Sequence, residues 1–306
     1  MLNTTYFIEE TISISDVVKN CFDICPGGKN MAFIQMNLLS QSLMRTVPVN
    51  VIIPADKMVF PGMPVREDKP YKTLYLLHGI FGNYTDWVNG TRIQRYAEEN
   101  DLVVVMPSGD NSFYLDRQGA MNNYGEFIGR ELVELTRKIF PLSHMREDTY
   151  IGGLSMGGYG AVRNGLKYHD TFGAIVALSS ALIVDGLKDR TNDTPNPIER
   201  RDYAESVFGD LNAVPDSDKN PKYLVEQLKK DGARIPAIYM ACGQDDFLLD
   251  DNKDFAKFLK DNGVPATFET GPGNHEWDFW DTYIKRAMDW LPLERSGAGI
   301  NSGNVR

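Results

Sequence analysis

A serine with glycines two residues away on either side lies in the segment Gly153-Leu154-Ser155-Met156-Gly157, which has the form G-x-S-x-G. An apolar, β-favouring run (149–154) precedes the serine, and a helix-compatible run (158–168) follows it. In that context the motif predicts a nucleophile elbow, a sharp strand-to-helix turn that presents the serine hydroxyl. A Cβ at 153 or 157 would collide with the opposite arm of such a turn. The pentapeptide alone is a weak signal, because an ordinary glycine-rich turn matches it too.

A nucleophilic serine needs a general base, and the chain has four histidines. Only His275 lies both downstream of Ser155 and on a loop at the end of a late strand, where an α/β-hydrolase carries its base. Two of the others lie upstream of the serine, and His169 ends a helix, where an imidazole can cap carbonyl groups. We therefore predict His275 as the base, the alternative being an exposed loop residue.

The acid is expected between these two residues, after the buried strand predicted at 235–242. Asp246 is the predicted acid, and Asp245 is its competitor one residue away. A buried carboxylate there would fix the tautomer of His275 and stabilise its imidazolium. The alternative is that both aspartates cap the next helix, and one can cap while the other orients the base. The order Ser155, Asp246, His275 is that of α/β-hydrolases.

Two backbone N–H groups are predicted to bind the oxyanion of an acyl-transfer intermediate. One belongs to Met156, and the other to Ile80 in the loop His78-Gly79-Ile80-Phe81-Gly82. We interpret His78 as a structural residue behind this loop. The residues predicted to bind substrate are Gly79, Phe81, Trp87 and Trp277. The aromatic rings would hold an acyl or phenolic group, and the alternative for each of them is a place in the core.

Four segments together resemble the esterase D group of α/β-hydrolases, most of all its bacterial tributyrin esterases and its feruloyl or cinnamoyl esterases. They are 78–87 (HGIFGNYTDW), 153–160 (GLSMGGYG), 242–248 (CGQDDFL) and 273–277 (GNHEW). The resemblance runs from about residue 33 to residue 291 and implies a serine carboxylesterase with Ser155, Asp246 and His275 as its triad. It implies short acyl or hydroxycinnamoyl esters as substrates, including plant-derived hydroxycinnamates and acylated sugars.

Two alternatives with the same triad stay open, an S-formylglutathione hydrolase-like thioesterase and an acetyl (xylan) esterase. S-formylglutathione hydrolases carry a Ser-Gly-Leu-Thr-Cys type segment where this chain has residues 78–82, which argues against the thioesterase. An acyltransferase that uses another acceptor, and a non-catalytic scaffold on the same fold, are further alternatives.

Other chemistries and partners find no support in the sequence. It contains neither H-E-x-x-H nor a P-loop motif, so we expect no metal and no other cofactor. The net charge of −10 argues against a nucleic-acid partner. Because no signal peptide and no membrane-spanning apolar run are visible, we expect a cytoplasmic protein without a membrane partner. A homo-oligomer is compatible with the sequence.

The alternation of strands and helices predicts one α/β-hydrolase domain over 31–293, with a mostly parallel central sheet covered by helices on both faces. Strands are expected at 31–39 and 44–53 (an antiparallel pair), 74–77, 102–106, 150–154, 174–178, 235–242 and 266–269. Helices are expected near 91–100, 124–140, 158–168, 199–208, 223–231, 252–262 and 277–290. Residues 1–30 are predicted as an N-terminal extension and 294–306 as a flexible tail. The long stretch 182–222 is predicted as a small cap or lid over the serine, the alternative being a surface excursion with no role in binding.

Overall fold

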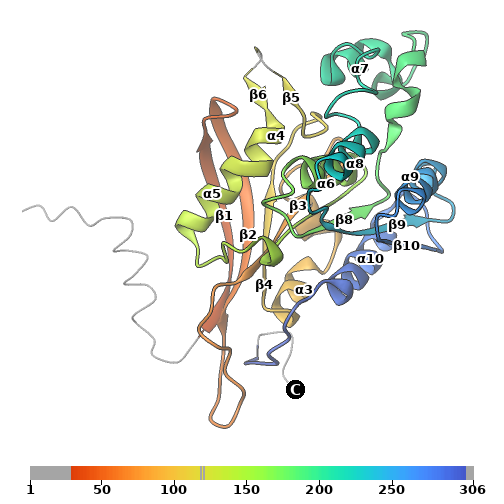
Figure 1. Ribbon diagram of the computed structural model, residues 1–306. Helices are drawn as coiled ribbons and strands as arrows, with labels where there is room; N and C mark the ends of the chain where they lie inside the picture. The colour runs from red at the N-terminus through yellow and green to blue at the C-terminus, as the bar shows by residue number, and fades with distance from the viewer. Residues whose placement is uncertain (1–28, 118, 120, 301–306) are drawn as a thin grey trace, which may run out of the picture.

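The computed structural model of the protein describes residues 29–117, 119 and 121–300. Nearly all of the predicted extension 1–30 therefore lies outside the described residues. The described part is built on an eight-stranded sheet with the order β1-β2-β4-β3-β7-β8-β9-β10 (Figure 1). Its strands are β1 (Lys29–Ser40), β2 (Arg45–Lys57), β3 (Lys72–Leu77), β4 (Leu102–Pro107), β7 (Thr149–Leu154), β8 (Ala174–Leu178), β9 (Ala237–Gly243) and β10 (Ala266–Gly271).

The sheet is parallel from β4 through β10, whereas β2 runs antiparallel to both β4 and β1. The predicted antiparallel pair and the mostly parallel sheet are thus confirmed. Every residue of β4, β7 and β8 is buried, as expected for strands covered on both faces. Because these strands are parallel, their carboxyl ends share one edge of the sheet, and the loops that follow them meet there.

Helices cover both faces of the sheet, as predicted (Figure 1). They include α3 (Ile93–Glu99), α5 (Leu132–Ile139), α6 (Met156–Lys167), α8 (Pro221–Lys230), α9 (Leu249–Asp261) and α10 (Trp277–Trp290). One core cluster joins α3 and α10 to side chains such as Leu74 and Val104. The other joins α5, α6, α8 and α9 to side chains such as Val103 and Ile151. Within the described residues, no helix combines the length and the apolar character needed to cross a membrane.

Three short elements were not expected from the sequence. They are the helix α2 (Asp86–Gly90) and the paired strands β5 (Asp116–Arg117) and β6 (Asn122–Asn123). Segments of two to five residues are too short to show a hydrophobic period, which explains why periodicity missed them. The helix predicted at 124–140 begins with α4 (Tyr124–Glu126) and continues through a π-helical turn (Phe127–Glu131) into α5.

The insertion between β8 and β9 contains two 3₁₀ turns (Ile183–Asp189 and Pro197–Glu199) and the helix α7 (Arg201–Phe208). The Phe208 ring packs against Phe113 and Tyr159, with centroid separations of 5.1 and 5.9 Å. The buried guanidinium of Arg163 pairs with Asp218 at 2.5 Å. Since Tyr159 and Arg163 belong to α6, the insertion is fastened to the helix that follows Ser155. A lid function for 182–222 stays a prediction.

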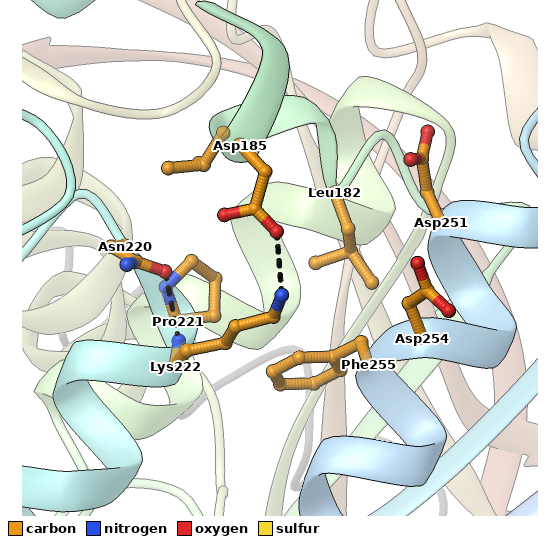
Figure 2. Close-up of a pocket in the computed structure, with 9 residues that line it drawn as sticks. Leu182, Asp185, Asn220, Pro221, Lys222, Asp251, Asp254 and Phe255 are labelled. Atoms are coloured by element: carbon orange, nitrogen blue, oxygen red, sulfur yellow. Dashed lines mark hydrogen bonds and ion pairs between the residues drawn. The ribbon is translucent and has the colours of Figure 1, made fainter.

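The two ends of this insertion approach each other beside α9 (Figure 2). Lys222, in the first turn of α8, pairs with Asp185 at 2.5 Å across a small hollow lined by Leu182 and Phe255. Asn220 caps α8 by accepting a hydrogen bond from the Lys222 N–H at 3.0 Å. The insertion is therefore held where it leaves the core and where it returns.

The segment 294–300, the first part of the flexible tail expected for 294–306, contacts distant parts of the chain. Met58 and Ile300 exchange two backbone hydrogen bonds of 2.9 and 2.8 Å, and Arg295 Nε donates to Asn100 Oδ1 at 2.9 Å. Ala298 is buried. These contacts attach 294–300 to distant parts of the chain, and the flexibility expected for this segment stays a prediction. Residues 301–306 lie outside the described residues.

Candidate active site

Ser155 lies in the turn between β7 and α6, with φ +54° and ψ −119°, a strained backbone conformation for a residue with a Cβ. A Cβ built on Gly153 would lie 2.3 Å from the Gly157 carbonyl oxygen. One built on Gly157 would lie 2.5 Å from the carbonyl oxygens of both Leu77 and His78. The predicted collision across the turn is thus confirmed for Gly153, whereas a Cβ at Gly157 would instead meet the backbone at the end of β3. The turn is tight enough to hold the hydroxyl at the N-terminus of α6.

We expect Gly157→Ala to lower the free energy of unfolding by about 1–3 kcal/mol, because backbone atoms of β3 would have to give way. Gly186→Ala is the matched control, since no atom lies within 4 Å of a Cβ built there. The control should change stability by no more than about 0.5 kcal/mol. Urea unfolding curves of the two variants measure both values, and equal stabilities would contradict the steric argument.

The imidazole of His275 lies between the side chains of Ser155 and Asp246. Its Nε2 is 3.0 Å from Ser155 Oγ, and its Nδ1 is 3.0 and 3.2 Å from Oδ2 and Oδ1 of Asp246. His275 belongs to the loop between β10 and α10, and Asp246 to the loop between β9 and α9. A carboxylate only accepts hydrogen bonds, so the neutral ring carries its proton on Nδ1. Nε2 is then an acceptor directed at the serine hydroxyl.

Asp246 is ionised although its side chain is fully buried. Burial raises its pKa, but hydrogen bonds from His275, the Leu248 N–H and the Ser179 hydroxyl outweigh that effect and hold the pKa below its ordinary value. The Leu248 N–H bond, 2.9 Å long, lies just before α9, so this carboxylate also binds backbone at the start of the helix. Asp245, the competing candidate, is exposed and forms no ion pair with His275 in the described structure.

Two N–H groups near Ser155 donate no hydrogen bond to another described residue. Met156 is the first residue of α6, where backbone N–H groups have no partner within the helix. Ile80 lies in the loop after β3, next to Gly79. A Cβ built on Gly79 would lie 3.5 Å from the Cβ of Ser155, so this loop runs alongside the serine. The N–H groups of Met156 and Ile80 are therefore available to stabilise an oxyanion that forms beside Ser155.

His78 and Asn111 hold the loop that carries Ile80. The buried His78 ring contacts the Gly79 carbonyl through Nδ1 at 2.7 Å, and its Nε2 accepts the Gly109 N–H at 2.8 Å. Burial lowers the pKa of His78, so the ring is neutral, with both nitrogens engaged in a structural role. Asn111 was not predicted. Its Oδ1 accepts the Phe81 N–H at 2.8 Å, and no sequence signal marks an asparagine for that contact.

The residues predicted to bind substrate occupy different environments. Gly79 lies beside the serine, and the Phe81 side chain is 74% exposed. Trp87 is only 1% exposed, and its Nε1 donates to the Leu77 carbonyl at 3.0 Å. The prediction that Trp87 contacts substrate is corrected, because this indole supports the core. Trp277 is half-buried with its ring against Trp87, at a centroid separation of 5.7 Å.

Phe247 and Trp280 lie next to His275, and neither was predicted from the sequence as a site residue. The Phe247 ring is 75% exposed and lies 4.7 Å from the imidazole, between centroids. The Trp280 ring meets the imidazole edge-on at 5.0 Å. The sequence held a weak signal that each residue lies beside the triad. Phe247 follows the predicted acid directly, and Trp280 lies one turn into the helix after the predicted base.

A serine at an elbow, a carboxylate after the penultimate strand and a histidine after the last one, on a mostly parallel sheet, define an α/β-hydrolase. Their hydrogen-bonded order is that of the serine hydrolases.

Comparisons with known proteins agree with this class. The family Esterase matches residues 40–291. An acetyl esterase of Caldicellulosiruptor saccharolyticus is 46% identical over 264 residues, which cover 85% of this chain and 98% of that protein. Two Staphylococcus aureus structures each match 85% of this chain and 98% of their own. They are the substrate-bound fluorophosphonate-binding serine hydrolase FphF (35% identity, TM-score 0.74) and the S-formylglutathione hydrolase FrmB (36%, 0.73). The chain belongs to this esterase family, and it is a carboxylic ester hydrolase.

Proposed function

We propose that this protein is a serine esterase that removes short acyl groups from ester substrates, with acetyl esters preferred. The observation that carries the proposal is the continuous line of hydrogen bonds from Asp246 through His275 to Ser155. The two unengaged N–H groups beside the serine add the second requirement of acyl transfer, a site for the oxyanion. The preference for acetyl is supported by the 46% identity to an acetyl esterase.

Acylation begins when His275 Nε2 takes the proton of the Ser155 hydroxyl while Oγ attacks the acyl carbonyl carbon. The carbonyl electron pair moves to oxygen, and the N–H groups of Met156 and Ile80 stabilise the resulting oxyanion. Asp246 stabilises the imidazolium that forms. The tetrahedral intermediate collapses with cleavage of the bond to the alkoxy oxygen, and His275 gives its proton to the departing alcohol.

Deacylation repeats these steps with water as the nucleophile. His275 takes a proton from water, the hydroxide oxygen attacks the acyl-enzyme carbonyl, and the same N–H groups stabilise the second oxyanion. Collapse releases the carboxylic acid and returns the proton to Ser155 Oγ. Each proton therefore passes through a single atom, Nε2 of His275.

Exposed aromatic rings support a site that also accepts an apolar group on either side of the ester. Phe81 and Phe247 are 74% and 75% exposed, and they adjoin the Ile80 N–H and the His275 ring respectively. Such rings favour contact with apolar or phenolic surface. Hydroxycinnamoyl esters are therefore included in the proposed substrate range.

A thioester substrate is a second candidate, favoured by the 36% identity to a structure of an S-formylglutathione hydrolase. The chemistry at Ser155 would be unchanged, and the leaving group would be a thiolate instead of an alkoxide.

Steady-state rates on p-nitrophenyl acetate, p-nitrophenyl butyrate, methyl ferulate, acetylated xylan and S-formylglutathione test the proposal. We expect kcat/KM for the acetyl ester to exceed that for the butyryl ester by about tenfold, a typical discrimination for one or two methylene groups. Mass spectrometry after treatment with a fluorophosphonate should place one adduct on Ser155. A higher kcat/KM on S-formylglutathione would favour the second candidate. Absence of hydrolysis together with absence of labelling would overturn both.

A further inference from the structure

The turn that follows β8 is tied to the backbone of the candidate nucleophile. Ser155 N–H donates to the Leu178 carbonyl, and the Ala181 N–H donates to the Ser155 carbonyl, both at 2.9 Å. Between these contacts lies Ser179, which is fully buried and has φ +44°, an uncommon value for a residue other than glycine. Its own N–H donates to the Ala241 carbonyl of β9 at 2.7 Å. The strained turn therefore joins the serine to the strand that leads to Asp246.

The direction of the hydrogen bonds at the Ser179 hydroxyl can be assigned. Trp280 Nε1 lies 3.0 Å from Ser179 Oγ, and an indole N–H only donates, so Oγ is the acceptor there. Its own proton is then free for another acceptor, and the candidate acceptor is the Asp246 carboxylate, since the Ser179 hydroxyl is one of the groups that lower the pKa of Asp246. The Cys242 thiol also lies near, but burial raises its pKa to about 12. It is therefore neutral, and a charged carboxylate is the stronger acceptor.

Trp280 connects Ser179 to the candidate base, His275. Its ring meets the His275 imidazole at 5.0 Å with an interplanar angle of 90°. Trp280 is 6% exposed, whereas Phe247, on the same imidazole, is 75% exposed. Of these two rings, Trp280 is the one fixed by burial and by a hydrogen bond. Packing that locks neighbouring side chains in this way preserves the geometry of a site.

We propose that Ser179 and Trp280 form a positioning pair, which holds the Asp246 carboxylate through the hydroxyl and the His275 imidazole through the indole ring. The inference rests on the proposed function, because it assumes that Asp246 and His275 act on Ser155. Neither member of the pair gives or takes a proton in the proposed reaction. Because Ser179 lies in the turn that is hydrogen-bonded to the Ser155 backbone, the pair also connects Asp246 and His275 to that turn.

Kinetics of Ser179→Ala and Trp280→Phe, with Ser180→Ala as the matched control, give the first test. Ser180 is equally buried, but its hydroxyl has no hydrogen-bond partner among the described residues. We expect Ser179→Ala to lower kcat about ten- to hundredfold with little change in KM, because misplaced catalytic groups slow chemistry more than binding. Trp280→Phe, which keeps a ring but loses the N–H, should lower kcat less, and Ser180→Ala should leave it unchanged. Wild-type kcat in both Ser179→Ala and Trp280→Phe would overturn the inference.

The second test reads the pKa of His275 by NMR, which does not depend on turnover. The chain has four histidines, so the signal can be assigned with a His275→Gln variant. The groups facing this ring are Asp246, the Ser155 hydroxyl and two aromatic rings, and Asp246 is its charged partner in the described structure. In Ser179→Ala the Asp246 carboxylate loses a hydrogen-bond donor, so more of its negative charge acts on the protonated His275 ring. The pKa of His275 should therefore rise in this variant.

A merely structural weakening would not move this pKa in a protein that remains folded. The Ser180→Ala protein should titrate like the wild type, and Trp280→Phe should give a smaller rise, which keeps the test decisive if Ser179→Ala does not fold. An unchanged pKa in the folded variants would overturn the positioning role even if Ser155 is labelled. A raised pKa in a protein whose Ser155 is neither labelled nor active would support the pair and refute the proposed function instead.

Discussion

Ser155→Ala is expected to reduce kcat on acetyl esters by about 10⁴- to 10⁶-fold, the range seen when the nucleophile of a serine hydrolase is removed. The reason is that no acyl-enzyme can form without Oγ, so hydrolysis depends on the oxyanion donors and on substrate binding alone. KM should change little, because the methyl group of alanine keeps the shape of the elbow. The variant should fold normally, since among the described residues the hydroxyl makes a single hydrogen bond, to His275.

The comparison with Ser180→Ala makes this experiment specific. Both serines are buried at the same edge of the sheet, but only Ser155 lies within hydrogen-bond distance of His275. Initial rates and fluorophosphonate labelling should both be lost in Ser155→Ala and both be retained in Ser180→Ala. A Ser155→Ala protein that keeps more than a few per cent of wild-type turnover would refute the covalent mechanism.

Asp246→Asn should lower kcat by about 10⁴-fold while leaving the fold intact. The side-chain amide of asparagine can present its NH₂ group to Nδ1, which favours the tautomer with the ring proton on Nε2. That nitrogen could then no longer accept the proton of Ser155, although every heavy atom would keep its place. The loss would therefore come from the position of one proton.

Asp245→Asn is the control that separates the two aspartates. It removes the same charge one residue away, but Asp245 is exposed and forms no ion pair with His275 in the described structure. Its kcat should stay within about twofold of wild type, since surface substitutions away from a site have small effects. A larger loss in Asp245→Asn than in Asp246→Asn would reassign the acid.

The sequence predicted the main strands, the helices on both faces and the positions of Ser155, Asp246 and His275 on neighbouring loops. It did so because hydrophobic runs of strand length, a glycine-flanked serine and the order of acid and base are local or ordered features of the chain. The need for Gly153 was also predictable, since it follows from the geometry of one turn, whereas the clash at Gly157 involves the neighbouring strand β3.

The remaining features depend on contacts between distant segments. Trp280 of α10 meets Ser179, in the turn after β8, across 101 positions, and no local pattern in either element marks that pair. Trp87 and Phe81 are both aromatic residues near one loop, yet one is buried and the other exposed. The sequence predicted a flexible tail over 294–306, and it gave no sign of the contacts that residues 295–300 make with Met58 and Asn100.

The attachment of the insertion to α6 has a mechanical consequence for the nucleophile. The Tyr159 N–H donates to the Ser155 carbonyl at 3.0 Å, while its ring packs on Phe208 of α7. Tyr159 therefore connects α7 to the elbow by direct contacts. Substitutions in α7 that disturb the contact between Phe208 and Tyr159 are therefore expected to alter turnover, although α7 supplies no member of the triad.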